Sequence, residues 1–75
     1  MEPIIFVDQY IVHSEEAPPR TDYFDAWYVD ASGDKYSGEG QTWESALVAL
    51  HHKLRQQGFD LDALPQARKG ETFHV

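Results

Sequence analysis

The clearest structural signal in the chain is the stretch TWESALVALHHKLRQQG, residues 42–58. Thr42 is a favoured N-cap residue, and Gly58 is a favoured residue just beyond the end of a helix. Between them, apolar side chains recur at helical spacing and form a single stripe: Trp43, Ala46, Leu47, Leu50 and Leu54. The stretch therefore predicts an amphipathic helix over residues 43–57. Its end is typical of a Schellman motif, in which Phe59 packs against Leu54.

Three segments before the helix are rich in β-branched and aromatic residues, a composition that favours strands. They are residues 3–13, 22–31 and 35–40. Pro18 and Pro19 predict a polar loop between the first two segments, because proline has no amide hydrogen to donate to a sheet. Gly33 predicts a turn between the second and third. The glycines of the third segment indicate a bulge or the close approach of another part of the backbone.

These elements predict an α+β fold in the order strand, strand, strand, helix (β-β-β-α). We expect a three-stranded antiparallel sheet with the helix packed on one face. In this interpretation residues 1–64 form a single domain, with one short turn near residues 60–65. Residues 65–75 show no hydrophobic pattern, and we expect them to form a flexible C-terminal tail.

The composition limits how the domain is stabilised. The chain has 75 residues and no cysteine, so neither disulfides nor thiolate metal sites reinforce its small core. Ten aromatic residues supply much of the apolar surface that such a domain buries. The chain opens with no signal-peptide pattern, and no stretch approaches the roughly 20 apolar residues of a membrane span. We therefore expect a cytoplasmic protein with no membrane partner.

Acidic residues are concentrated in the first two-thirds of the chain. Residues 1–46 hold ten acids and two bases, a net charge of −8, whereas residues 47–75 carry a net charge of +1. A negative field of this kind repels phosphates and attracts basic protein surfaces. It predicts a basic protein partner and no direct binding of nucleic acid. The alternative is that the acids only keep a small protein soluble.

Patterns typical of catalysis or of metal binding are weak. His51 and His52 are adjacent on the predicted helix and point about 100° apart, so they do not share one ion easily. His13 and His74 would have to converge from distant segments. The two glycines before the helix flank an acid, which disfavours a phosphate-binding loop. We find no triad or nucleophile arrangement, and we expect no enzyme, no cofactor and no metal site.

The second strand segment places different side chains on its two faces. Tyr23, Asp25 and Trp27 share one face, and more apolar residues share the other. A single helix covers only one face of a sheet, and aromatic anchors ringed by acids are typical of protein interfaces. The alternative is that these aromatics simply belong to the core. The predicted partner-binding residues are Asp22, Asp25, Trp27, Asp30, Asp34, Tyr36, Glu39 and Glu44.

Two short stretches resemble a known family. They are residues 30–33 (DASG) in the turn and residues 40–47 (GQTWESAL) at the entry to the helix. Over about residues 3–57 the chain resembles the N-terminal domain of HicB-type antitoxins. That family typically shows an aspartate-to-glycine turn, then a glycine-x-threonine-x-glutamate-x-alanine-leucine pattern, which the second stretch matches. The resemblance implies a β-β-β-α domain that binds a small basic toxin acting on RNA, often within an oligomer.

Two functions of different classes follow. The first is a small acidic inhibitor or regulator that occludes the basic surface of a nucleic-acid-handling protein. HicB-like antitoxins and phage-encoded anti-defence or anti-CRISPR proteins are of this type. Its carboxylates occupy arginines and lysines that otherwise bind phosphate. The alternative is a small enzyme or ligand-binding domain with a pocket at a homodimer interface, and the sequence leaves formation of a homodimer open.

Overall fold

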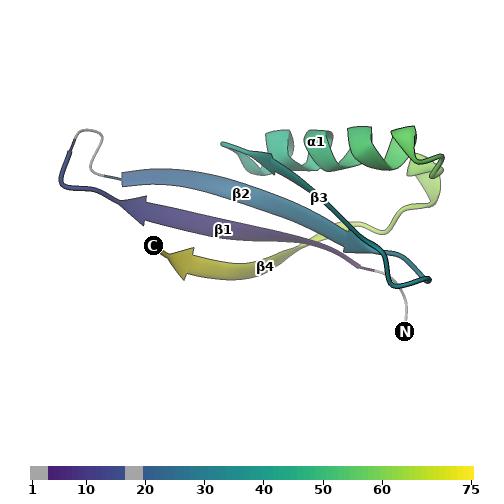
Figure 1. The fold of residues 1–75 in the computed structure, drawn as a ribbon, viewed down its shortest axis with the longest axis horizontal. Coiled ribbons are helices and arrows are strands. Elements are labelled where there is room, and N and C mark those ends of the chain that lie inside the picture. Colours follow the sequence, from purple (N-terminus) through teal and green to yellow (C-terminus); the bar gives the residue numbers. More distant parts are fainter. Residues whose placement is uncertain (1–3, 17–19) are drawn as a thin grey trace.

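The computed structural model describes residues 4–16 and 20–75 of the chain. In order along the chain its elements are β1 (Ile5–His13), β2 (Arg20–Val29), β3 (Lys35–Gly40), α1 (Trp43–Gln56), a short 3-10 turn η1 (Leu61–Ala63) and β4 (Ala67–His74). The strands form one sheet in the order β3-β2-β1-β4, and α1 packs over one face of it (Figure 1). The proline pair that predicted a loop lies outside the described residues.

The predicted three-stranded antiparallel sheet is wrong, and so is the flexible C-terminal tail. β4 pairs with β1 in parallel, with Ile5 opposite Ala67 and Tyr10 opposite Phe73, so the sheet has four strands and is mixed. The reason lies in the backbone of β1, whose two edges both carry amide and carbonyl groups that need hydrogen-bond partners. β2 occupies one side, and the C-terminal segment occupies the other. The α+β class with one helix is confirmed.

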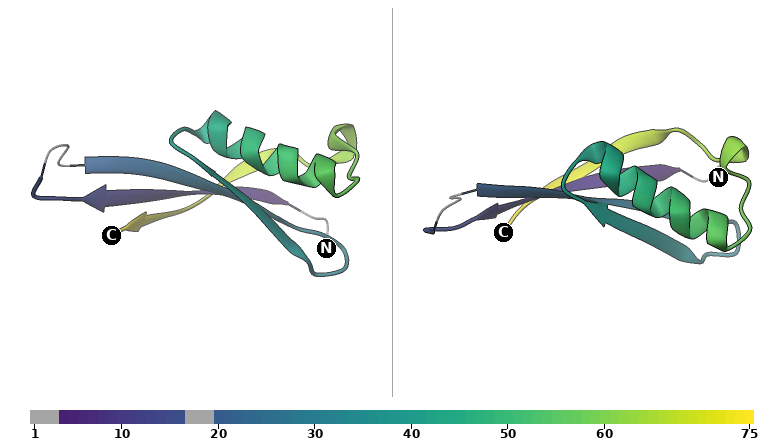
Figure 2. Two further views of the ribbon diagram at one scale, coloured as in Figure 1. Left: turned by 45° about the horizontal axis from the view of Figure 1, so that its top comes forward. Right: turned by 90° about the horizontal axis from the view of Figure 1, so that it is seen from above.

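Glycine in β3 allows the helix to lie directly on the strand. A β-carbon on Gly38 would stand 2.3 Å from the backbone nitrogen of Leu50, and one on Gly40 would stand 2.6 Å from that of Ala46. Neither position therefore accepts a larger side chain without moving the helix. This is the close backbone approach that the glycines indicated. Figure 2, seen from above, shows α1 running over β3.

The core lies between the helix stripe and one face of the sheet. Its buried residues are Ile5, Val7, Ala26, Tyr28, Ala46, Leu50 and Leu54. The strand members come from alternate positions of β1 and β2, and the helix members come from the predicted stripe. All are apolar or aromatic, so burial of apolar surface is the main force that holds α1 to the sheet.

Both ends of α1 follow the sequence signals. The side chain of Thr42 accepts a hydrogen bond from the amide of Ser45, whose hydroxyl accepts in turn from the amide of Thr42. At the other end Gly58 has a φ of 88°, and the amide of Phe59 donates to the carbonyl of Leu54 over 3.0 Å. The predicted Schellman ending is confirmed, because this long hydrogen-bonded loop around a left-handed glycine defines the motif.

Candidate protein-docking surface

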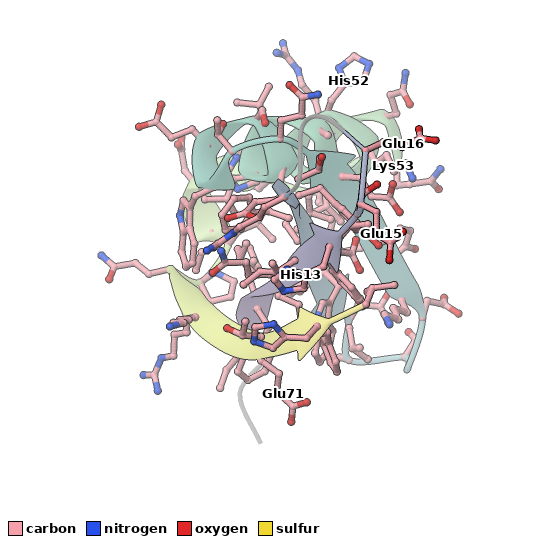
Figure 3. The ribbon with its side chains drawn as sticks, turned by 90° about the vertical axis from the view of Figure 1, so that its left-hand side faces the viewer. His13, Glu15, Glu16, His52, Lys53 and Glu71 are labelled. Carbon is pink, nitrogen blue, oxygen red and sulfur yellow. The ribbon has the colours of Figure 1, made fainter. Side chains whose placement is uncertain are left out.

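One face of the sheet carries no helix. Side chains alternate between the two faces of a strand, and the strand register assigns those that share the side opposite α1. We call this side the open face. It carries Phe6, Asp8, Tyr10, Val12, Thr21, Tyr23, Asp25, Trp27, Val29, Lys35, Ser37, Glu39, Arg68 and Phe73. Figure 3 views the molecule from one end of the sheet. Glu71 of β4 points away from the helix there, whereas His52 lies on the outer side of α1 and Lys53 lies on its flank.

Three carboxylates cross the open face in one line. Asp8 on β1 lies directly opposite Asp25 on β2, and Asp25 lies directly opposite Glu39 on β3. We call these three residues the acidic row. Like charges placed directly opposite each other destabilise a sheet, by about 0.2–1 kcal/mol for a pair. The repulsion between neighbouring carboxylates of the row therefore weakens the sheet, and a cation placed beside them would reduce it.

Asp25, the central residue of the acidic row, has an oxygen without a hydrogen-bond partner in the described part of the chain. Oδ1 of Asp25 is buried and has no hydrogen-bond partner among the described residues. Burial of the carboxyl raises the pKa of Asp25, the charge of Glu39 raises it further, and Lys35 opposes both effects. The ionised form of Asp25 is thus held in an unfavourable environment. An arriving cation would favour that form, because opposite charge stabilises a carboxylate.

Asp8 has a different role within the row. Its Oδ2 accepts a hydrogen bond from Nε1 of Trp27 over 2.9 Å, and its Oδ1 accepts one from the amide of Glu71 over 2.9 Å. The second bond spans an irregularity in the β1–β4 pairing, beside Gly70. A β-carbon on Gly70 would collide with the Asp8 carboxylate. Asp8 therefore ties β1 to both of its neighbours and fixes the indole of Trp27.

Stacked aromatic rings run beside the acidic row. The ring of Tyr10 stacks on Phe73 at 4.9 Å on one side and on Tyr23 at 4.8 Å on the other, measured between ring centroids. We call these three rings the aromatic ladder, since they join β4, β1 and β2. Burial raises the pKa of Tyr10, and the carboxylates of Asp25 and Asp8 raise it further. The Tyr10 hydroxyl therefore stays protonated and neutral beside the row.

A second aromatic pair lies on the other side of the row. Phe6 packs on Trp27 with ring centroids 5.0 Å apart, and the ammonium of Lys35 lies 4.9 Å from the Trp27 ring centroid. A recess of about 560 Å³ opens beside this pair, lined by Phe6, Asp8, Trp27, Lys69, Gly70, Glu71 and Phe73. The open face thus combines aromatic side chains, which are typical anchors of protein interfaces, with carboxylates that attract a cationic partner.

The structure brings three of the predicted site residues together on the open face. Asp25 and Glu39 belong to the acidic row, and Trp27 lies next to it. Tyr36 does not join them, because it lies opposite Tyr28 on the helix-covered face and packs edge-on against Phe59. Tyr36, predicted together with Trp27 as a partner-binding residue, therefore lies on the opposite face of the sheet from Trp27.

The other predicted acids lie apart from the row. Oδ1 of Asp30 accepts hydrogen bonds from the amides of Ser32 and Asp34 at 2.9 Å each, so Asp30 shapes the β2–β3 turn in which Asp34 also lies. Asp22 is on the helix side of the sheet and pairs with Arg20 at 2.8 Å. That guanidinium lowers the pKa of Asp22 by hydrogen bonding. Glu44 lies in the first turn of α1.

Sequence reasoning missed the aromatic residues and the aspartate that β1 and β4 contribute to the site: Phe6, Asp8, Tyr10 and Phe73. A usable signal existed for the three in β1. They alternate with Ile5, Val7 and Ile11, which are buried, so period-two spacing places them together on the opposite face. An aspartate within an apolar strand also indicates a specific partner, here the indole of Trp27. Phe73 had no such signal, because β4 itself was not predicted.

Two histidines do converge at the end of the sheet. Nε2 of His13 lies 3.2 Å from Nδ1 of His74, within hydrogen-bonding distance. Both side chains are exposed, and His52 contacts Gln56 on the helix instead. Among residues 4–16 and 20–75, no three histidine, cysteine, aspartate or glutamate side chains are grouped to hold a metal ion. The two imidazoles therefore form a hydrogen bond at the end of the paired strands β1 and β4.

Comparisons with known proteins give no family. No protein-family model matches the chain, and no curated protein or solved structure matches it. In the part of the chain that the structure describes, no helix has the length and apolar character to cross a membrane.

Proposed function

We propose that this protein acts in the cytoplasm as an acidic inhibitor or regulator that docks on a basic protein through its open face. The partner is a protein that handles nucleic acid, and docking blocks its phosphate-binding surface. The observation that carries this proposal is the acidic row, which crosses three strands of an uncovered, aromatic-rich face. Repulsion between Asp25 and its neighbouring carboxylates weakens the sheet of the isolated chain, and a basic partner would relieve that cost.

The chemistry of the face suits a basic protein better than other ligands. Carboxylates form short, strong hydrogen bonds with arginine and lysine, the same groups that bind phosphate. The net charge of −7 repels nucleic acid and accelerates encounter with a cationic protein. Aromatic side chains such as Trp27 and Tyr10 supply contact area at low conformational-entropy cost. An antitoxin and a phage-encoded inhibitor of host defence both act by such occlusion, and the proposal covers both.

Affinity capture from a bacterial lysate tests the proposal with charge-matched variants. The open-face variant carries Asp25→Lys and Glu39→Lys. The control carries Glu15→Lys and Glu16→Lys, which make the same charge change in an exposed loop. We expect the wild type and the loop variant to retain a basic nucleic-acid-binding protein, identified by mass spectrometry, and the open-face variant to lose it. Equal retention by both variants would refute docking through the open face.

Competition then tests occlusion itself. The captured partner is purified and bound to its own RNA or DNA, labelled with a fluorophore. Addition of the wild-type protein should release the nucleic acid, with a competition curve that shifts to higher concentration for the open-face variant. A stable ternary complex of protein, partner and nucleic acid would show that docking occurs without occlusion, and the inhibitory role would then be wrong.

A further inference from the structure

The aromatic ladder is open at one end. Its rings occupy equivalent positions on β4, β1 and β2, as Phe73, Tyr10 and Tyr23. The next equivalent position would lie on β3, one pleat beyond Glu39, but β3 ends at Gly40. Among the described residues, no fourth ring therefore continues the stack. Tyr23 instead lines a recess of about 310 Å³ together with Glu39, Gly40 and Gln41.

A carboxylate stands at the rim of this recess. Glu39 is exposed, and within the described ranges the one ion pair joins Arg20 to Asp22, so Glu39 has no cationic partner there. Asp25, with its unpaired buried Oδ1, is opposite Glu39 in the register and two residues from Tyr23 on the same face. The recess thus joins an aromatic ring, Tyr23, to one carboxylate, Glu39, and a second carboxylate, Asp25, lies opposite Glu39 in the sheet.

We propose that this recess takes the guanidinium of an arginine from the bound partner, which stacks on Tyr23 as the next member of the ladder. The inference rests on the proposed function, because it names the group that a basic partner would present. A guanidinium is planar, stacks on aromatic rings and donates paired hydrogen bonds to a carboxylate. A lysine ammonium has the charge but not the planar fork, and a phosphate is repelled by Glu39.

The open face already contains a contact of the same kind. The ammonium of Lys35 lies 4.9 Å from the ring centroid of Trp27, beside the acidic row. That cation comes from the chain itself and occupies the ring on one side of the row. On the other side of the acidic row, the ring of Tyr23 lines the recess, where a cation from a partner could bind. A partner's cation bound at Tyr23 would therefore repeat, on this side of the acidic row, the contact that Lys35 makes with Trp27.

Two short peptides provide the test: a capped tetra-arginine and a capped tetra-lysine of equal charge. Each is titrated into the ¹⁵N-labelled protein, and amide shifts report where it binds and how tightly. We expect tetra-arginine to bind about threefold to tenfold more tightly than tetra-lysine, with the largest shifts at Tyr23, Gly40 and Gln41, since cation–π contacts of this kind contribute on this scale. Equal affinity for the two peptides would overturn the proposal.

Variants separate stacking from charge. Tyr23→Phe keeps the ring and should keep the preference for arginine, whereas Tyr23→Leu removes the ring and should abolish that preference. Glu39→Gln should weaken both peptides, and Glu44→Gln, which removes one charge from the helix instead, should weaken arginine binding less. The amide spectrum of each variant shows that it is folded. Survival of the arginine preference in Tyr23→Leu would contradict the assigned site.

The proposed function and the arginine site fail in different ways. If capture of a basic partner depends on the acidic row but is unchanged by Tyr23→Leu, the docking function stands and the arginine site is wrong. If tetra-arginine binds at Tyr23 but no basic partner is captured, the site stands and the docking function is wrong. The peptide titration and the lysate capture therefore test the two statements separately.

Discussion

The two faces of the sheet are built from different chemistry. The helix-covered face presents small and apolar groups, including Val7, Ala26 and Gly38, and its residues are explained by how closely α1 packs on them. The open face presents aromatic rings and a line of carboxylates in adjacent strands. Packing against α1 explains the buried residues of the first face. It does not explain the second, because like charges opposite each other weaken the sheet that carries them.

The largest expected effect lies on the covered face. Leu50→Ala removes a fully buried side chain of the helix stripe, and the cavity left behind should lower the free energy of unfolding by about 2–5 kcal/mol. Val48→Ala is the matched control, because Val48 is on the same helix but is 66% exposed, and it should change stability by less than about 0.5 kcal/mol. Urea denaturation followed by circular dichroism measures both. Similar losses for the two variants would mean that α1 does not pack as described.

The next effect tests the close approach of helix and strand. Gly38→Ala places a β-carbon against the backbone of Leu50, and the resulting displacement of α1 should cost about 1–3 kcal/mol. Ser37→Ala is the adjacent change on the open face and should be nearly neutral. Thermal unfolding of the two variants provides the comparison. A neutral Gly38→Ala would show that the helix lies farther from β3.

Local signals made the helix predictable. The apolar spacing, Thr42 at one end and Gly58 at the other act within a few residues of each other, and the sequence located both ends to within one residue. β4 has no comparable local signal. It is an edge strand of mostly exposed residues, and its pairing with β1 joins segments about sixty residues apart. This pairing depends on the edge of β1 that β2 leaves unpaired. No short stretch of sequence reveals that edge.

The candidate site was predicted in part for the same reason. Period-two alternation within β2 placed Asp25 and Trp27 on one face, and the structure agrees. The error with Tyr36 had a signal that was not used. Gly38 and Gly40 contact the helix, and Tyr36 shares their face by the same alternation, so the glycines implied that Tyr36 faces α1. The cross-strand row itself needs the register, which sequence spacing alone does not supply.

A smaller effect is expected at the end of the acidic row that has partners. Asp8→Ala removes the acceptor for the indole of Trp27 and for the amide of Glu71, so we expect a loss of about 1–2 kcal/mol. Asp8→Asn keeps one acceptor oxygen and should lose less. Amide hydrogen exchange gives a local readout, because the Glu71 amide should exchange faster in Asp8→Ala. Unchanged exchange at Glu71 would contradict the assigned bond.

The smallest expected effect is a gain in stability, whereas the substitutions on the covered face lower it. Asp25→Asn removes the central charge of the row, and at pH 7 it should stabilise the fold by about 0.2–1 kcal/mol while weakening capture of a basic partner. The folded-state pKa of Asp25 is raised, so the folded chain holds its proton more tightly than the unfolded chain does. Wild-type stability from this carboxyl is therefore present at low pH and is lost as the pH rises through the raised value.

It follows that the stability advantage of Asp25→Asn should shrink on acidification and vanish below about pH 3.9, where the carboxyl is neutral in both states. Urea titrations of the wild type and the variant between pH 3 and 7 measure this difference, with Glu44→Gln as the control for removing a charge outside the row. If Asp25→Asn destabilises the fold at pH 7, the ionised carboxylate is already compensated within the chain. The open face would then lack the unmet charge on which docking of a cation depends.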